Sequence, residues 1–147
     1  MIDQDRAYSI SLEKISGLDP EFRDRVMDWY EECHAHELLV YVYEGQRSAA
    51  RQDYLYSLGR ERPGKIVTNA RGGQSFHQYG RAIDWVPLIP HPRAKGMFEA
   101  GWGEKDLYAA GQAKAHAYQM RALDWETPHL EDARFKNWRE LLLGQKV

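Results

Sequence analysis

The clearest helical pattern lies early in the chain, where large apolar side chains recur every three or four residues. Asp19 is a favoured N-cap residue, and Pro20 suits the first helical position because an N–H there would have no partner. Acidic residues occupy the opposite side, which is typical of a helix with one buried face. We therefore predict a scaffold helix from Pro20 to about His34–His36, with inward residues Phe22, Val26, Trp29, Tyr30 and Cys33.

Three further helices are predicted. Ser48 is an N-cap candidate for a helix that reaches about Leu58, and Gly59 closes it. Apolar residues at helical spacing predict a longer helix from Lys105 to Leu123. The last helix is expected to start at Asp132, with inward residues Phe135, Trp138, Leu141 and Leu142.

Short runs rich in β-branched and aromatic residues predict a sheet. The runs are Leu38–Tyr43, interpreted as a central strand, Ile66–Ala70, Ala82–Leu88, also interpreted as central, and a short last strand with His129 and Leu130. Residues 93–104 favour irregular structure, either a flap over a cleft or an ordinary loop. The expected fold class is α+β, with a small, mainly antiparallel sheet and helices packed on it.

Composition indicates one soluble domain. The chain has 147 residues, 43% of them hydrophobic, so we expect residues 1–147 to form a single domain with its own core and no second module. The single cysteine, Cys33, excludes an internal disulfide and a cysteine-based zinc site. The polar start lacks a signal-peptide pattern, and no segment is long and apolar enough to span a membrane, so synthesis in the cytoplasm is expected.

Charge is distributed unevenly although the net charge is only −2. Residues 1–44 hold eleven acidic and four basic side chains, whereas residues 45–74 hold six basic and two acidic ones. A basic segment that enters a cleft would favour an anionic ligand. A solvated basic surface is the alternative interpretation of the same residues.

Two short segments carry candidate metal chemistry. The first runs from Ser75 to Asp84 and contains His77, and the second, Glu126-Thr127-Pro128-His129-Leu130-Glu131, lies far downstream. Two imidazoles and a carboxylate form a suitable ligand set for a catalytic zinc that keeps one position open. His77, Asp84 and His129 are therefore candidate ligands. Ordinary structural roles for the same side chains, such as a loop histidine and a strand-end cap, are the alternative.

A catalytic zinc site also needs a base for its water, and Glu126 is the candidate. Pro128 favours extended backbone at the preceding residue, and a turn or bulge would let Glu126 and His129 reach one cleft. Asp124 is the rival carboxylate.

These motifs resemble a known family of zinc peptidases. Ser75, His77, Gly80, Ala82 and Asp84 match a Ser-x-His-x-x-Gly-x-Ala-x-Asp motif, and Glu126 and His129 match the second motif, Glu-x-Pro-His-x-Glu. Residues 45–60 are similar to a Gly-x-Arg-Ser…Gln…Leu-Tyr…Gly-Arg block, and the three blocks occur in family order. The resemblance is to the D-Ala-D-Ala carboxypeptidase and L-alanyl-D-glutamate endopeptidase family, which includes VanY-like enzymes and phage endolysins.

The resemblance implies roles for individual residues. His77, Asp84 and His129 would hold Zn²⁺, Glu126 would be the base, and Arg47 would bind the substrate carbonyl and its developing oxyanion. Ser75 would bind substrate or orient His77, and Gln52 would reach the cleft. Phage members often carry a Trp-Gly-Gly stretch before the last block. In this chain Leu123-Asp124-Trp125 runs directly into Glu126, so that loop is shortened or absent.

The implied function is a zinc-dependent peptidoglycan peptidase that cleaves stem peptides, with L-Ala-D-Glu endopeptidase of the phage endolysin type as the first hypothesis. D-Ala-D-Ala carboxypeptidase or dipeptidase activity is an alternative, because these activities share the catalytic residues. A non-catalytic zinc-binding module and a purely structural protein are further alternatives. The expected enzyme is a monomer whose partner is the bacterial stem peptide, and we expect neither nucleic-acid binding nor insertion into a membrane. It would act on the cell wall after release. No separate wall-binding domain is expected.

Overall fold

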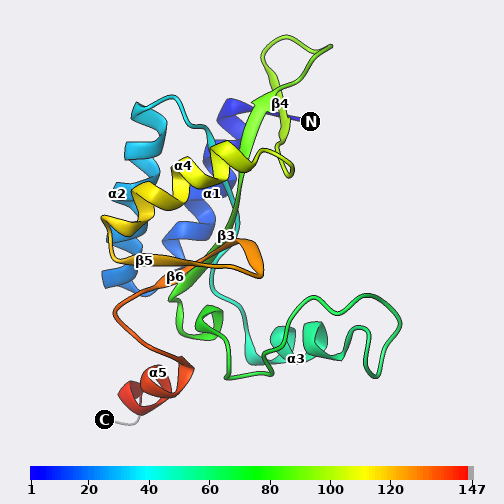
Figure 1. The fold of residues 1–147 in the computed structure, drawn as a ribbon, viewed down its shortest axis with the longest axis vertical. Coiled ribbons are helices and arrows are strands. Elements are labelled where there is room, and N and C mark those ends of the chain that lie inside the picture. Colours follow the sequence, from blue (N-terminus) through cyan, green and yellow to red (C-terminus); the bar gives the residue numbers. More distant parts are fainter. Residues whose placement is uncertain (146–147) are drawn as a thin grey trace.

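A computed structural model describes residues 1–145 of the chain, and its elements are arranged around one long strand, β3 (Figure 1). In chain order they are β1 (Ile2–Asp3), α1 (Gln4–Ser16), α2 (Pro20–Ala35), β2 (Val40–Glu44), α3 (Ala49–Ser57), the 3₁₀ helix η1 (Phe76–Tyr79), β3 (Ala82–Pro90), β4 (Met97–Ala100), α4 (Lys105–His116), β5 (Met120–Leu123), β6 (Glu126–Asp132) and α5 (Trp138–Gln145).

The sheet is antiparallel at each pairing of its named strands. Its order is β1-β4-β3-β6-β5, and β2 pairs with β3 outside this path. Along β3, the segment at Ala82–Asp84 pairs with β6, the segment at Asp84–Pro87 with β2, and the segment at Leu88–Pro90 with β4. The predicted α+β class with a mainly antiparallel sheet is confirmed.

The two faces of β3 have different environments because side chains alternate along a strand. Ile83 and Trp85 are fully buried in the main core, which is formed with helices α2 and α4. Figure 1 shows α1, α2 and α4 grouped beside the sheet, while α3 and α5 lie at the opposite end of the molecule. Asp84 points to the other face, so the strand that anchors the core also carries a candidate ligand.

Close packing on the core face makes Gly111 of α4 a sensitive position. A Cβ at this residue would lie 2.4 Å from Cη2 of Trp85, and the Gly111 carbonyl also accepts a hydrogen bond from Trp29 Nε1 at 2.9 Å. Gly111→Ala is expected to destabilise the fold by about 1–3 kcal/mol, because overpacking outweighs the better helix propensity of alanine. Urea unfolding of this variant, compared with Gly144→Ala in α5, where nothing lies within 4 Å, checks the prediction. Equal stability of the two variants would contradict it.

The structure confirms two predicted helices. α2 starts after the N-cap Asp19 and buries the five expected residues, including Cys33. Burial raises the pKa of the Cys33 thiol to about 12, so a structural role fits this residue. Ser48 caps α3 by accepting a hydrogen bond from the backbone N–H of Arg51.

The sequence patterns missed helix α1. Its buried positions are Ala7, Ser11 and Ile15, so two of the three residues on its inward face are small or polar and give a weak apolar signal. The hydroxyl of Ser11 accepts a hydrogen bond from the backbone N–H of Val42 at 2.9 Å, which ties α1 to β2.

The prediction of one helix from Lys105 to Leu123 was wrong. α4 ends at His116, the backbone reverses through Gln119 with a φ of +58°, and Met120 begins β5. Met120 is buried and pairs with Asp132 of β6. Met120 and Leu123, which were expected to end the helix, therefore belong to strand β5.

Three predictions about the sheet and its neighbouring loops also need correction. Ile66–Ala70 is a loop in which Ile66 and Val67 are 58% and 52% exposed, because no described strand lies beside it. Residues 93–104 are neither a flap nor wholly irregular, since β4 pairs with β3 and β1. β2 pairs only with β3 among the described strands and is an edge strand, whereas β3 is central, as expected, and continues through Pro87 to Pro90.

The last helix starts later than predicted. Asp132 is the final residue of β6, where its buried carboxylate accepts hydrogen bonds from Arg25 and Arg81. The amide oxygen of Asn137 accepts from the backbone N–H groups at the start of α5 instead. Of the expected inward residues, Leu141 is buried. No helix within residues 1–145 has the length and apolarity to cross a membrane.

Candidate metal centre and active-site cleft

His77, Asp84 and His129 come together from three elements, although 52 residues separate the first and last of them in the sequence. Each offers one ligand atom, and these atoms lie within 4.8 Å of one another. Asp84 on β3 and His129 on β6 are direct cross-strand partners, so the antiparallel register itself places them side by side. His77 reaches them from η1.

Local structure fixes the position of His77. Ser75 and Gln78 form a capping box around η1, and the Ser75 hydroxyl accepts a hydrogen bond from the backbone N–H of His77. Gly80 ends the turn with a φ of +66°, and a Cβ there would lie 2.6 Å from the backbone nitrogen of Asp19. Only glycine therefore fits the turn that leads from η1 into β3.

The two imidazoles present different nitrogens to Asp84. Nδ1 of His77 lies 2.7 Å from the carbonyl oxygen of Gly45, and Nε2 of His129 lies 2.8 Å from Oε1 of Glu131. These contacts require N–H donors at those positions, which leaves His77 Nε2 and His129 Nδ1 as lone-pair donors. They lie 3.3 and 3.5 Å from Oδ1 of Asp84.

The same three atoms fit a metal ion. His77 Nε2, His129 Nδ1 and Asp84 Oδ1 are buried and have no hydrogen-bond partner among residues 1–145. Buried polar atoms are normally paired, so three unpaired acceptors that face one point fit a cation-binding site. Two imidazoles and one carboxylate suit zinc, and the Glu131 contact to His129 is the outer-shell support usual for such a ligand.

The electrostatics of the cluster favour positive charge at this point. Burial alone would raise the pKa of Asp84, but the adjacent side chains of His129 and His77 hold it well below its ordinary value. Burial alone would lower the pKa of His129, but Asp84 and Glu131 raise it to about 9. The carboxylates thus stabilise a cation in this cluster, as a metal site requires.

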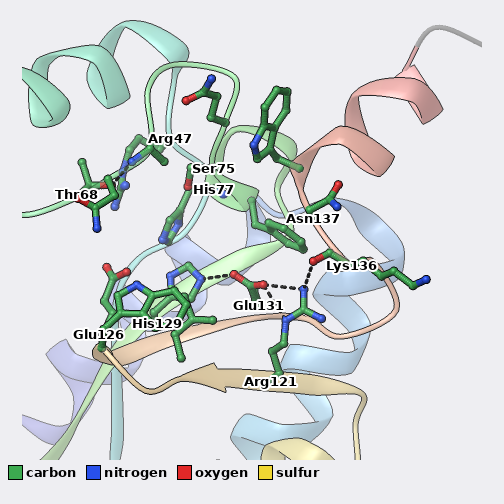
Figure 2. Close-up of a pocket in the computed structure, with 17 residues that line it drawn as sticks. Arg47, Thr68, Ser75, His77, Arg121, Glu126, His129, Glu131, Lys136 and Asn137 are labelled. Atoms are coloured by element: carbon green, nitrogen blue, oxygen red, sulfur yellow. Dashed lines mark hydrogen bonds and ion pairs between the residues drawn. The ribbon is translucent and has the colours of Figure 1, made fainter.

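Glu126 lies on the wall of the cleft that contains the histidines. The cleft has a volume of about 540 Å³, and Glu126, Arg47, His77 and His129 are among its lining residues (Figure 2). Burial raises the pKa of Glu126, His129 lowers it and Asp84 raises it, with a net upward shift. Such a carboxylate suits proton transfer. Asp124, the rival candidate, is exposed in the β5–β6 turn and does not line the cleft.

Arg47 is held rigidly at the edge of the cluster. Its Nε donates to Glu44 at 2.7 Å, Nη1 donates to Gln52 at 2.7 Å, and Nη2 donates to Asp84 at 3.3 Å. The guanidinium therefore has a fixed plane, and its other N–H donors remain for a ligand. Its backbone N–H also donates to the carbonyl of His77.

The two predicted substrate-binding residues occupy different positions. Ser75 lines the cleft as well as capping η1. Gln52 is fully buried behind Arg47, where it also donates to the Thr68 hydroxyl and the Ala70 carbonyl. This placement lets Gln52 orient Arg47 and the 59–75 loop, and its direct contact with substrate stays a prediction.

Sequence reasoning assigned no role to Glu131 or Arg121. Glu131 is two residues after His129, and strand alternation places both side chains on one face. That spacing was the available signal for Glu131. Arg121 pairs with Glu131 from β5, and this contact was hidden because Arg121 fell within a supposed helix.

Comparisons with known proteins show which family the chain resembles in sequence. The model of the family described as VanY, D-alanyl-D-alanine carboxypeptidase, matches residues 16–133. The peptidoglycan L-alanyl-D-glutamate endopeptidase CwlK of Bacillus subtilis (strain 168) is 56% identical over 47 residues. That match spans 32% of this chain and only 28% of the relative.

Solved structures show the same fold at low sequence identity. The Serratia marcescens L-Ala D-Glu endopeptidase ChiX is 20% identical with a TM-score of 0.57, and the match covers 90% of each chain. The LdcB LD-carboxypeptidase is 22% identical with a TM-score of 0.59, covering 88% of this chain and 64% of the other. The D,D-pentapeptidase VanY, solved with Zn(II), is 15% identical with a TM-score of 0.57, covering 84% and 77%.

Proposed function

The chain belongs to the VanY D-alanyl-D-alanine carboxypeptidase family, and from this premise we propose that it is a zinc-dependent peptidase of bacterial peptidoglycan stem peptides. One observation carries the proposal: His77, Asp84 and His129 each present a buried ligand atom with no hydrogen-bond partner in residues 1–145, and these atoms face one point in a cleft that Glu126 also lines. A bound zinc ion would supply Lewis acidity there, polarising a carbonyl and lowering the pKa of a water molecule.

The chain's own residues supply the proton transfer. Glu126 takes a proton from the attacking water and passes it to the nitrogen of the scissile peptide bond. The water oxygen bonds to the carbonyl carbon while the C=O π electrons move onto the carbonyl oxygen. When that electron pair returns, the C–N bond breaks and the amine leaves with the proton from Glu126. The second water proton is lost as the new carboxylic acid ionises, so the products are a carboxylate and an amine. The raised pKa of Glu126 suits the first half of this transfer, because a stronger base accepts a proton more readily from water.

Arg47 stabilises the negative charge that develops on the carbonyl oxygen. Its guanidinium is fixed by Glu44, Gln52 and Asp84 before substrate binds, so little reorganisation is needed during the reaction. Ser75 is the proposed polar contact for the substrate backbone on the same wall. One chain supplies all of these groups, which supports action as a monomer.

For the cleaved bond we propose L-Ala-D-Glu. The sequence is 56% identical to CwlK over 47 residues, and the fold of ChiX matches over 90% of each chain. Both relatives are named as endopeptidases of that bond, which supports the proposal. Removal of a terminal D-alanine is the second candidate, because the family model and the VanY and LdcB structures carry carboxypeptidase or pentapeptidase names. The phage endolysin assignment stays a prediction that rests on sequence resemblance.

Digestion of purified sacculi, followed by mass spectrometry of the released muropeptides, tests this function. An L-Ala-D-Glu endopeptidase leaves L-alanine on the glycan and a new amino terminus on D-glutamate. A carboxypeptidase instead shortens the stem peptide by its terminal D-alanine. Sacculi that bind the protein but acquire no new termini would favour the non-catalytic binding module.

The contact between Glu131 and His129 gives a separate prediction about the metal. Glu131→Gln removes the negative charge that orients His129, so zinc affinity is expected to fall by about 10- to 100-fold. Competition with a chromophoric chelator measures this affinity without any peptide substrate. Wild-type affinity in the variant would show that Glu131 does not support the metal ligand.

A further inference from the structure

Arg121 lies one strand away from the proposed metal ligands, on the same face of the sheet. It is the cross-strand partner of Glu131, so β5 places its side chain beside that carboxylate. Nε and Nη2 of Arg121 lie 2.8 and 2.6 Å from Oε2 of Glu131. Two nitrogens of a planar guanidinium on one carboxylate oxygen fix the carboxylate more firmly than a single contact would.

The second oxygen of Glu131 continues this chain of contacts to the metal centre. Oε1 accepts a hydrogen bond from Nε2 of His129 at 2.8 Å. Figure 2 shows the three side chains in one line along the floor of the cleft, from Arg121 through Glu131 to His129. The orientation of His129 thus depends on a carboxylate whose own orientation depends on Arg121.

Arg121 also contacts the two other segments that build the cleft. Nη2 donates to the backbone carbonyl of Phe135, next to the cleft-lining residues Lys136 and Asn137. The guanidinium lies over the ring of Phe76, with 5.4 Å to the ring centroid, and Phe76 directly precedes His77. One side chain therefore joins η1, β6 and the segment before α5.

We propose that Arg121 is a positioning residue for the metal centre. Through Glu131 it holds His129 in the tautomer and ring orientation that present Nδ1 to the ion, and through Phe135 it holds the C-terminal wall of the cleft. The inference rests on the proposed function in one respect, namely that the site binds zinc. It does not depend on which peptide bond is cut.

A merely structural role for Arg121 would show a different pattern. Its side chain is 31% exposed, and partly exposed ion pairs contribute little to stability. Arg121→Met keeps the apolar stem over Phe76 but removes the guanidinium. We expect this variant to keep its circular dichroism spectrum and, in the metal-free state, nearly the wild-type melting temperature, while its zinc affinity falls by about 10-fold or more.

The decisive experiment is a double-mutant cycle on zinc affinity, measured by competition with a chromophoric chelator. The variants are Arg121→Met, Glu131→Gln and the double variant, with Arg23→Met as control, because Arg23 pairs with its neighbour Asp24 on α2. If Arg121 acts through Glu131, the double variant binds zinc no more weakly than Glu131→Gln alone. Cobalt-loaded Arg121→Met is also expected to show altered d–d absorption, because the His129 ligand has moved.

Three results would overturn the inference. They are zinc affinity of Arg121→Met within twofold of wild type, fully additive losses in the double variant, and an unchanged cobalt spectrum. Each of these leaves the proposed peptidase function intact, because the wild-type chain would still bind zinc. A wild-type chain that binds no zinc overturns the proposed function together with this inference.

Discussion

Glu126→Gln is expected to lower kcat by about 10²–10⁴-fold while leaving zinc content and fold unchanged. Glutamine has nearly the same shape as glutamate but cannot accept a proton from water. Its position on the cleft wall, rather than in the metal cluster, predicts intact metal binding. Initial rates on a soluble stem peptide, with zinc measured by atomic absorption, check both parts.

Asp124→Asn is the matched control for this prediction. It removes a carboxylate two residues away that is exposed and does not line the cleft, so its activity is expected to stay close to wild type. If Asp124→Asn lost turnover and Glu126→Gln kept it, the general base would be Asp124, and the burial of Glu126 would need another explanation.

Removal of zinc is expected to abolish turnover and to destabilise the fold. Without the ion, the donor atoms of His77, Asp84 and His129 are buried and unpaired, which is unfavourable in a folded protein. A ligand present at 1,000 times its Kd stabilises the folded state by about 4 kcal/mol, so dialysis against a chelator should lower the melting temperature measurably. Added zinc should restore both the melting temperature and the activity.

Histidine variants provide the control for metal removal. His129→Ala is expected to reproduce the chelated state, whereas His116→Ala, which removes an exposed histidine at the end of α4, should bind zinc like wild type. Activity that persists after chelation, or an equal zinc loss in the two variants, would contradict the assignment of the ligands.

The candidate ligands could be named from the sequence because they stand in short motifs, and the structure brings their side chains together. His77 and Asp84 lie seven residues apart with Gly80 between them, and the predicted strand Ala82–Leu88 begins where β3 begins. Helix α2 could be predicted for a similar reason, since its cap and its large apolar stripe are contiguous. For α2 and for the start of β3, the local sequence signals were sufficient.

The remaining features depend on contacts between distant segments. Whether Met120 continues a helix or begins a strand is decided by β6, which pairs with it. Ile66 and Val67 have strand-forming side chains, but no neighbouring strand is present to pair with them among the described residues. Arg121 was overlooked for the same reason, because its partner Glu131 becomes its neighbour only once the β5–β6 register is known.

Strand pairing fixes Asp84 on both sides, whereas two loops near the cleft lie outside the strand ladders. Asp84 is paired with Glu44 on one side and His129 on the other, so it cannot shift without a slip in strand register. The 59–75 loop and the β5–β6 turn at Asp124–Trp125 have no such constraint from a strand ladder. New substrate preferences should therefore evolve through substitutions and length changes in these two segments, while the ion-binding residues remain unchanged.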